Sequence, residues 1–369
     1  MNHATTADRL KRAQQLVSAN GLDAILVTPG PDLRYLTGYD AVPLERLTCL
    51  VVPATGAASV VVPLLEQAAA TASPIGAAGL QVHPWGESED PYALVAALLP
   101  GAQAVGLDDH MWAAKVLGLR TAMPGVEQLL AGPVTSRLRM RKTPDEVQAL
   151  REAGAAIDEV HARMAEWLKP GRTEAEVGRD ISAAILVAGH ATVDFVIVAS
   201  GPNGASPHHE VSDRVIERGD PVVVDIGGTM PSGYCSDSTR TYAVGEPVPD
   251  FLALYEVLRA AQEAACRWAR PGVTAASVDL AAREVIEASG YGEAFIHRTG
   301  HGIGLETHEE PYIVAGNELV LEAGMAFSVE PGIYLPGRFG SRIEDIVVCT
   351  EDGVERLNLQ PRSLLILEA

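Results

Sequence analysis

Two stretches of the chain, 222–244 and 325–349, place acidic residues inside patterns that otherwise predict buried β-hairpins. Each stretch begins with an apolar run, passes through a turn rich in Gly and Pro, and returns, which is typical of a hairpin. We expect the two acids of each hairpin to face each other across the ladder. Four buried carboxylates that converge repel one another strongly unless cations lie between them, so the pattern favours a metal site. The four acids are Asp225 and Asp237 in the first stretch and Glu330 and Glu344 in the second.

Each hairpin pattern follows two segments of helical periodicity, so the chain contains an approximate repeat. Asp225 and Glu330 are 105 residues apart, and Asp237 and Glu344 are 107 residues apart. Two halves of this kind can pack around a pseudo-two-fold axis and bring their acids together. The expected helices, the first capped by Thr143 and the second by Thr173 with Glu176, span residues 143–168, 173–189, 249–268 and 274–289.

The residues before this repeat predict a separate domain in which short buried strands alternate with helices, which is typical of an α/β layer. A basic cluster within 132–142 interrupts the pattern, and we interpret it as a solvated linker. We therefore expect one domain over residues 1–136 and a second over 137–369. The expected strands of the first domain are 23–28, 47–52, 59–62 and 104–107, and its expected helices are an amphipathic N-terminal segment, 92–99 and 111–119.

The charge balance of the chain limits its partners and its location. The net charge of −20 argues against nucleic acids and anionic membrane surfaces as partners. No apolar run is long enough to span a membrane, and the N-terminal segment lacks the continuous apolar core of a signal peptide. The four cysteines are scattered without CxxC spacing, which favours a reducing compartment over a zinc–thiolate site. We expect a cytoplasmic protein.

Histidines gather in the loops before the two hairpins. Five of the ten histidines lie between residues 208 and 308, and His301 is flanked by glycines that allow a close backbone approach. Four carboxylates with one imidazole form a mostly oxygen site, which suits a pair of Mn, Co or Zn ions. Two such ions can hold a bridging hydroxide near neutral pH and polarise a carbonyl, so the expected reaction class is metal-assisted hydrolysis. A dinucleotide fingerprint, a P-loop, a GxSxG elbow and an HExxH zinc motif are all missing from the sequence.

Five motifs, in order, resemble those of the pita-bread metallopeptidases: VVVDIGG, YCSDSTRTY, TGHGIGLETHEEP, SVEPGIY and SRIEDIV. An N-terminal segment, PDLRYLTGY, resembles the first domain of the branch that contains prolidases, aminopeptidases P and creatinases. The resemblance implies an α/β (α+β) protein with a creatinase/prolidase-like N-terminal domain. A C-terminal pita-bread domain with a pseudo-two-fold repeat would follow it.

The resemblance also implies a role for each matching residue. Asp225 would bind one metal ion, His301 and Glu330 would bind the second, and Asp237 and Glu344 would bridge the two. The remaining roles would be His208 near the scissile carbonyl, His308 at the tetrahedral intermediate, Glu330 in proton transfer, His297 in the proline pocket, Arg342 near the substrate carboxylate or behind the ligands, and Tyr334 along the site. We expect His209, next to His208 in an extended segment, to lie at the surface.

The implied activity is cleavage of the Xaa-Pro bond of dipeptides or short peptides by two divalent ions, Mn first and Co or Zn as alternatives. Aminopeptidase P activity on longer peptides is the alternative, followed by a metal-free creatinase-like amidinohydrolase and a non-catalytic binding protein. The last two classes should have lost ligands that this sequence retains. One departure concerns Tyr312, which stands where many members of the resembled family carry a basic or small residue. If an arginine at that position normally binds the substrate C-terminus, another residue must do so here. The family also implies a homodimer.

Overall fold

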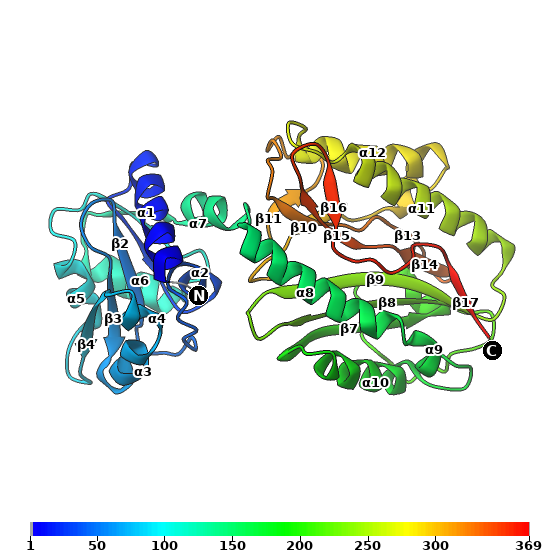
Figure 1. Cartoon of the computed structure of the whole chain (residues 1–369), viewed down its shortest axis with the longest axis horizontal. Coiled ribbons are helices and arrows are strands. Elements are labelled where there is room, and N and C mark those ends of the chain that lie inside the picture. Colours follow the sequence, from blue (N-terminus) through cyan, green and yellow to red (C-terminus); the bar gives the residue numbers. More distant parts are fainter. Residues whose placement is uncertain (1–2, 369) are drawn as a thin grey trace. The chain divides into compact units, whose positions relative to one another are not determined.

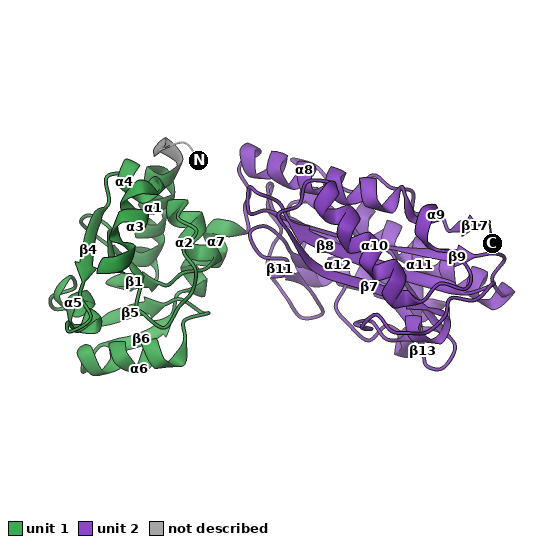
Figure 2. Cartoon of the chain, turned by 90° about the horizontal axis from the view of Figure 1, so that it is seen from below, with its two compact units in different colours: residues 1–139 green, residues 140–369 purple. Residues whose placement is uncertain are grey.

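The computed structural model describes residues 3–368, so Met1, Asn2 and Ala369, which the expected domain ranges include, lie outside the described residues. The chain divides into two compact units, residues 1–139 and 140–369 (Figure 2). The boundary that we expected after residue 136 falls inside helix α7 (Gly132–Arg139). In the described part of the chain, no helix combines the length and apolar character that crossing a bilayer requires.

The interpretation of 132–142 as a solvated linker is wrong. Most of the segment is helical, and its basic residues include two that are buried. Arg139 Nη1 lies 2.7 Å from Asp32 Oδ1 within the first unit. Lys142 Nζ lies 2.5 Å from Glu309 Oε1 within the second unit. A basic cluster predicts a solvated segment only when its charges have no buried partner, and here both partners are distant in sequence.

The first unit is an α/β layer around a six-stranded mixed sheet of order β4-β3-β2-β1-β5-β6. The four predicted strands are confirmed as β1, β2, β3 and β5. The two strands that we missed, β4 and β6, form the sheet edges, where exposed side chains weaken the hydrophobic pattern. The strands are β1 (Ala24–Val27), β2 (Cys49–Pro53), β3 (Ser59–Pro63), β4 (Gln81–Trp85), β5 (Ala104–Leu107) and β6 (Glu127–Leu130), and the other helices are α1 (His3–Ala19), α2 (Pro31–Thr37), α3 (Gln67–Ala72), α4 (Pro74–Ala77), α5 (Pro91–Ala97) and α6 (Ala113–Ala122).

The second unit begins with the first half of the predicted repeat. The predicted N-cap Thr143 and the predicted capping box of Thr173 with Glu176 are both confirmed, and Thr143 forms a capping box with Glu146 as well. Strands β7, β8 and β9 form an antiparallel sheet that β17 extends. The elements are α8 (Pro144–His161), α9 (Met164–Trp167), α10 (Glu174–Val187), β7 (Thr192–Ser200), β8 (Pro221–Thr229), β9 (Cys235–Val244) and β17 (Leu365–Leu367).

The second half repeats this order of helices and strands (Figure 1). The single hairpin that we predicted over 325–349 is wrong, because the segment forms two nested strand pairs. β12 pairs with β15, and β13 and β14 form a separate two-stranded sheet between them. Pro331 has no N–H to donate, which is consistent with the end of β12 just before it. The elements are α11 (Pro249–Trp268), α12 (Ala275–Ala288), β10 (Gly300–Gly302), β11 (Glu309–Ile313), β12 (Ala326–Val329), β13 (Gly332–Leu335), β14 (Phe339–Arg342), β15 (Asp345–Cys349) and β16 (Val354–Arg356).

Strand alternation separates the acids from the apolar core. Val222, Val224 and Ile226 of β8 pack in one cluster with α8 and α10, and each such fully buried side chain contributes about 1.5–3 kcal/mol relative to exposure. Because successive side chains of a strand point to opposite faces, Asp225 lies on the other face of the sheet. Phe327 and Val329 of β12 pack with α11 and α12 in the same way.

The register of the strands corrects one expectation about the acids. Asp225 lies opposite Thr239, and Asp237 lies opposite Gly227, so these two aspartates share a face but are offset by two residues. In the second half, Val329 lies opposite Asp345, and the same register extended by one residue would place Glu330 opposite Glu344. The expected facing arrangement is therefore wrong for the aspartates, and the glutamates lie just beyond the paired residues.

Candidate metal centre

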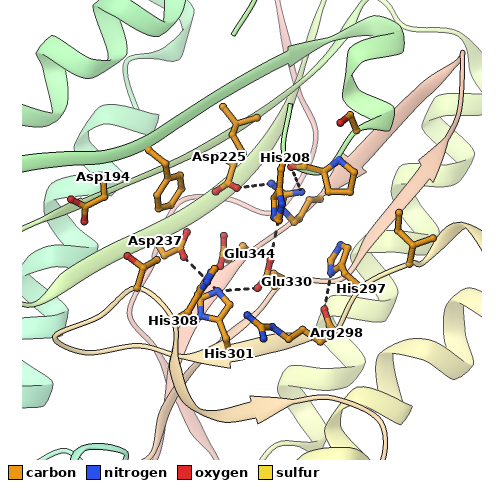
Figure 3. Close-up of a pocket in the computed structure, with 17 residues that line it drawn as sticks. Asp194, His208, Asp225, Asp237, His297, Arg298, His301, His308, Glu330 and Glu344 are labelled. Carbon is orange, nitrogen blue, oxygen red and sulfur yellow. Dashed lines mark hydrogen bonds and ion pairs between the residues drawn. The ribbon is translucent and has the colours of Figure 1, made fainter. Parts of the chain in front are cut away.

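The structure brings the five predicted metal ligands together in the second unit (Figure 3). Oxygens of Asp225, Asp237 and Glu344 lie within 4.8 Å of one another, as do ligand atoms of His301, Glu330 and Glu344. His301 Nε2 lies 3.1 Å from Glu330 Oε1 and 3.6 Å from Asp237 Oδ2. Four strands or strand ends from the two halves of the repeat thus supply carboxylates to one place.

Glycines on both sides of His301 allow its strand to pack closely between its neighbours. A Cβ at Gly300 would lie 1.9 Å from the Ser328 carbonyl oxygen, and one at Gly302 would lie 2.2 Å from the Glu310 carbonyl oxygen. We expected these glycines to let the backbone approach a ligand, and in the structure they make room for neighbouring backbone. The Nδ1 atom of His301 lies 3.1 Å from the Gly302 carbonyl oxygen, which leaves Nε2 directed at the carboxylates.

The carboxylates strongly perturb one another. Burial, together with the negative charges of Glu344, Asp225 and Glu330, raises the pKa of Asp237 well above its usual value. Burial and the charges of Glu330 and Asp225 likewise raise the pKa of Glu344. Burial also opposes ionisation of Glu330, but its hydrogen bond to His301 and the nearby positive charge lower its pKa to about 2. The cluster therefore holds more negative charge than its surroundings neutralise.

Two carboxylate oxygens of the cluster have no hydrogen-bond partner. Asp225 Oδ1 and Glu344 Oε1 are buried and unpaired among the described residues. Unpaired buried acceptors are costly, and a divalent cation would satisfy both. Oxygen ligands with one imidazole suit Mn, Co or Zn, so the donor set fits a metal centre.

Arg342 connects this cluster to a second layer of polar side chains. Its Nη2 lies 2.5 Å from Asp225 Oδ2, and its Nη1 donates to the Tyr334 hydroxyl at 2.7 Å. The Tyr334 hydroxyl lies 2.9 Å from His297 Nε2. Tyr334 is itself buried, and the chain of contacts runs from Asp225 through Arg342 and Tyr334 to His297.

The five candidate ligands form part of the wall of a cavity of about 880 Å³. The cavity wall includes all three histidines to which we assigned substrate or catalytic roles: His208, His297 and His308. The His308 ring lies 4.0 Å from the His301 ring. Burial and the positive charges of His301 and Arg298 lower the pKa of His308 to about 4. The imidazole of His308 is therefore neutral at neutral pH and can donate a hydrogen bond from one ring nitrogen.

The expectation that His209 lies at the surface is wrong. Its side chain is only 18% exposed, and its Nε2 lies 2.8 Å from Glu174 Oε2. Glu174, which is fully buried, also accepts hydrogen bonds from Ser200 and Ser212. Sequence reasoning missed Glu174 because it lies in the first turn of α10, where an acid is expected simply to complement the helix dipole.

Comparisons with known proteins find relatives that match nearly the whole chain. Residues 148–351 match metallopeptidase family M24, and residues 9–141 match the creatinase/prolidase N-terminal domain. A probable dipeptidase PepE of Mycobacterium tuberculosis is 56% identical over 362 residues, covering 98% of this chain and 96% of that protein. A Xaa-Pro dipeptidase of Lactobacillus helveticus is 37% identical, covering 97% of this chain and 98% of that protein. The crystal structure of dipeptidase PepE from Mycobacterium ulcerans is 54% identical, with a TM-score of 0.97 and coverage of 100% of both chains.

Proposed function

The chain belongs to metallopeptidase family M24, and on that basis we propose that it is a Xaa-Pro dipeptidase working with two divalent metal ions. The observation that carries this proposal is the convergence of four carboxylates and His301, with two buried oxygens unpaired. Similarity over nearly the full length to a Xaa-Pro dipeptidase supports the substrate class. A creatinase-like or non-catalytic protein is disfavoured because every predicted ligand is retained.

The proposed ligand assignment follows the position of each residue in the cluster. Asp225 would hold one ion, and His301 with Glu330 would hold the other. Asp237 and Glu344, whose oxygens group with ligand atoms of both sides, would bridge them. We propose Mn as the resident metal, because oxygen ligands dominate, with Co or Zn as alternatives. When bound, the ions supply an acidified water and polarise the scissile carbonyl.

The residues of the cavity would then guide hydrolysis of the bond before proline. His208 would contact the scissile carbonyl, and neutral His308 would donate a hydrogen bond to its oxygen as negative charge develops there. Glu330, ionised at neutral pH, would accept a proton from the attacking water and pass it to the proline nitrogen as the C–N bond breaks. The products are the free amino acid and proline.

The residues around Arg342 would hold this arrangement in place. Arg342 forms an ion pair with Asp225, so we assign it to orienting this metal ligand and not to binding the substrate directly. Tyr334 would act through its contacts with Arg342 and His297, and His297 would line the proline pocket.

Peptide hydrolysis tests this proposal directly. We expect the purified, manganese-loaded chain to cleave Ala-Pro and to leave Ala-Ala, which lacks proline, essentially intact. The tripeptide Ala-Pro-Ala should be a poor substrate. Rapid cleavage of the tripeptide without cleavage of Ala-Pro would assign the chain to the aminopeptidase P activity instead.

We also propose that the protein is a cytoplasmic homodimer. The four cysteines are buried and unpaired, which supports a reducing compartment. The net charge of −20 disfavours binding to nucleic acids and to anionic membranes. Light scattering coupled to size-exclusion chromatography would measure the mass, and a mass of one chain at micromolar concentration would contradict the dimer.

A further inference from the structure

The cavity wall contains two permanent cations, Arg298 and Arg342, and they differ in how they are paired. Arg342 forms an ion pair with Asp225 and is almost fully buried. Arg298 forms no ion pair with any carboxylate of the described residues. Its guanidinium lies instead over the ring of Tyr312, with 4.4 Å from its Cζ atom to the ring centroid. The positive charge of Arg298 is therefore free to bind an anion in the cavity.

The surroundings of Arg298 hold its side chain ready for such a ligand. Stacking on an aromatic ring restricts the rotamers of an arginine but leaves its N–H groups available in the plane of the guanidinium. The backbone of Tyr312 is held on both sides, because its N–H donates to Glu310 Oε2 and its carbonyl accepts from Asn317 Nδ2.

Outside the candidate metal ligands, the cavity wall formed by the described residues offers Arg298 no carboxylate as an ion-pair partner. Asp194 is the one carboxylate of the cavity wall outside the metal cluster. It accepts hydrogen bonds from Thr192 and Thr229, and Figure 3 shows it on the opposite side of the cluster from Arg298.

We propose that Arg298, held on the ring of Tyr312, binds the C-terminal carboxylate of the substrate and thereby selects dipeptides. This inference rests on the proposed Xaa-Pro dipeptidase function, under which every substrate carries a carboxylate on its proline. An arginine binds a carboxylate through two parallel N–H···O bonds, which adds both affinity and orientation. Tyr312 thus supports the carboxylate-binding group through its ring.

The test compares Ala-Pro with Ala-Pro-amide, which lacks the carboxylate, on the manganese-loaded full chain. In the wild type, kcat/KM should favour Ala-Pro. In Arg298→Gln we expect this preference to fall by about 10- to 100-fold, mainly through KM, because charge-assisted hydrogen bonds are lost. Arg298→Lys should retain part of the preference. Competitive inhibition by L-proline relative to L-prolinamide should fall in parallel.

Matched variants separate binding from folding. Arg270, which stacks on Trp268 outside the cavity wall, provides the control, and Arg270→Gln should keep the wild-type preference. Tyr312→Ala should lower the preference, whereas Tyr312→Phe, which keeps the ring, should preserve it. If Arg298→Gln does not fold, the comparison of Tyr312→Ala with Tyr312→Phe tests the same inference.

Three outcomes would overturn the inference. Equal losses for Ala-Pro and Ala-Pro-amide would show a structural role. A loss confined to Glu-Pro would assign Arg298 to the acidic side chain before proline. If the wild type cleaves Ala-Pro and Arg298→Gln keeps the wild-type preference for Ala-Pro over Ala-Pro-amide, only this inference is contradicted. If the wild type is inactive on every Xaa-Pro peptide, the proposed function is contradicted as well.

Discussion

The Arg342 guanidinium lies 2.5 Å from the Asp225 carboxylate and joins the two halves of the repeat at the metal cluster. Arg342 belongs to β14 of the second half, and Asp225 belongs to β8 of the first. Their side chains are 3% and 12% exposed, so the pair is shielded from solvent. A buried ion pair contributes little net stability when intact, but removing one partner leaves an uncompensated charge.

Replacing Arg342 should therefore destabilise the metal-free protein most. We expect Arg342→Met to lower the free energy of unfolding by about 3 kcal/mol in chelator, because Asp225 loses its counter-charge among like charges. The loss should be smaller with bound metal, which neutralises Asp225 directly. Urea unfolding with and without Mn measures both values. An equal loss in the two conditions would contradict the proposed pairing of Asp225 with metal, and Arg163→Met, at an exposed ion pair, should change little.

Replacing Asp237 should have the opposite effect on the metal-free protein. Its pKa is raised by burial and by three neighbouring carboxylates, so the ionised form is disfavoured there. Asp237→Asn should raise the free energy of unfolding in chelator by about 1 kcal/mol and abolish the stabilisation that Mn confers on the wild type. Thermal unfolding with and without Mn provides the measurement. A variant that is less stable without metal and still stabilised by Mn would argue against the bridging role.

The buried histidine His161 predicts a pH dependence of stability. Burial and the charge of Arg240 lower its pKa to about 3, and its ring contacts the Tyr242 hydroxyl and the Ser238 carbonyl. The unfolded chain binds the proton more tightly, so stability is lost as pH falls from about 6.5 towards 3 and is unaffected above that window. His161→Gln should reduce the pH dependence of the free energy of unfolding by up to about 1.4 kcal/mol per pH unit between about pH 3 and 6.5. Identical slopes for the two proteins in urea unfolding at pH 4–6 would show that His161 does not titrate as expected.

Glu174 should position the loop that carries His208. Its carboxylate accepts hydrogen bonds from Ser200, His209 and Ser212, so it fastens both ends of that loop to the start of α10. Glu174→Gln should lower the free energy of unfolding by about 2–3 kcal/mol, because a charged acceptor is replaced by a neutral amide. It should also raise KM for Ala-Pro more than it lowers kcat. The control Glu176→Gln, in the same helical turn but partly exposed, should leave KM unchanged, and equal KM in both variants would contradict a positioning role.

The convergence of the candidate metal ligands could be predicted from sequence because acids are out of place in apolar strands, and their spacing repeats. Asp225 ends a run of valines, and Glu330 ends the corresponding run in the second half. The burial of Arg139 and Lys142 could not be predicted, because their partners Asp32 and Glu309 lie 107 and 167 residues away. Pairing over such distances leaves no local periodicity.

The other misses have a similar physical cause. Strands β13 and β14 interrupt the second hairpin, and only the tertiary fold determines whether the residues between two pairing strands form a loop or a further sheet. Glu174 looked like an ordinary acid of a helix N-terminus because its hydrogen-bond donors lie at the end of the next strand or beyond it. The pairing state of Arg298 and Arg342, which decides which of them is free to bind substrate, likewise depends on contacts that sequence spacing does not encode.

Metal titration of the stripped protein, followed by Ala-Pro hydrolysis, tests the central claim most directly. The protein is depleted with a chelator, titrated with Mn, and assayed for bound metal and for proline release at each step. Full activity should appear only as occupancy approaches two ions per chain, and Glu344→Gln should fail to reach it. Full Ala-Pro hydrolysis by the metal-free chain, or two bound ions with no hydrolysis of any Xaa-Pro peptide, would contradict the account.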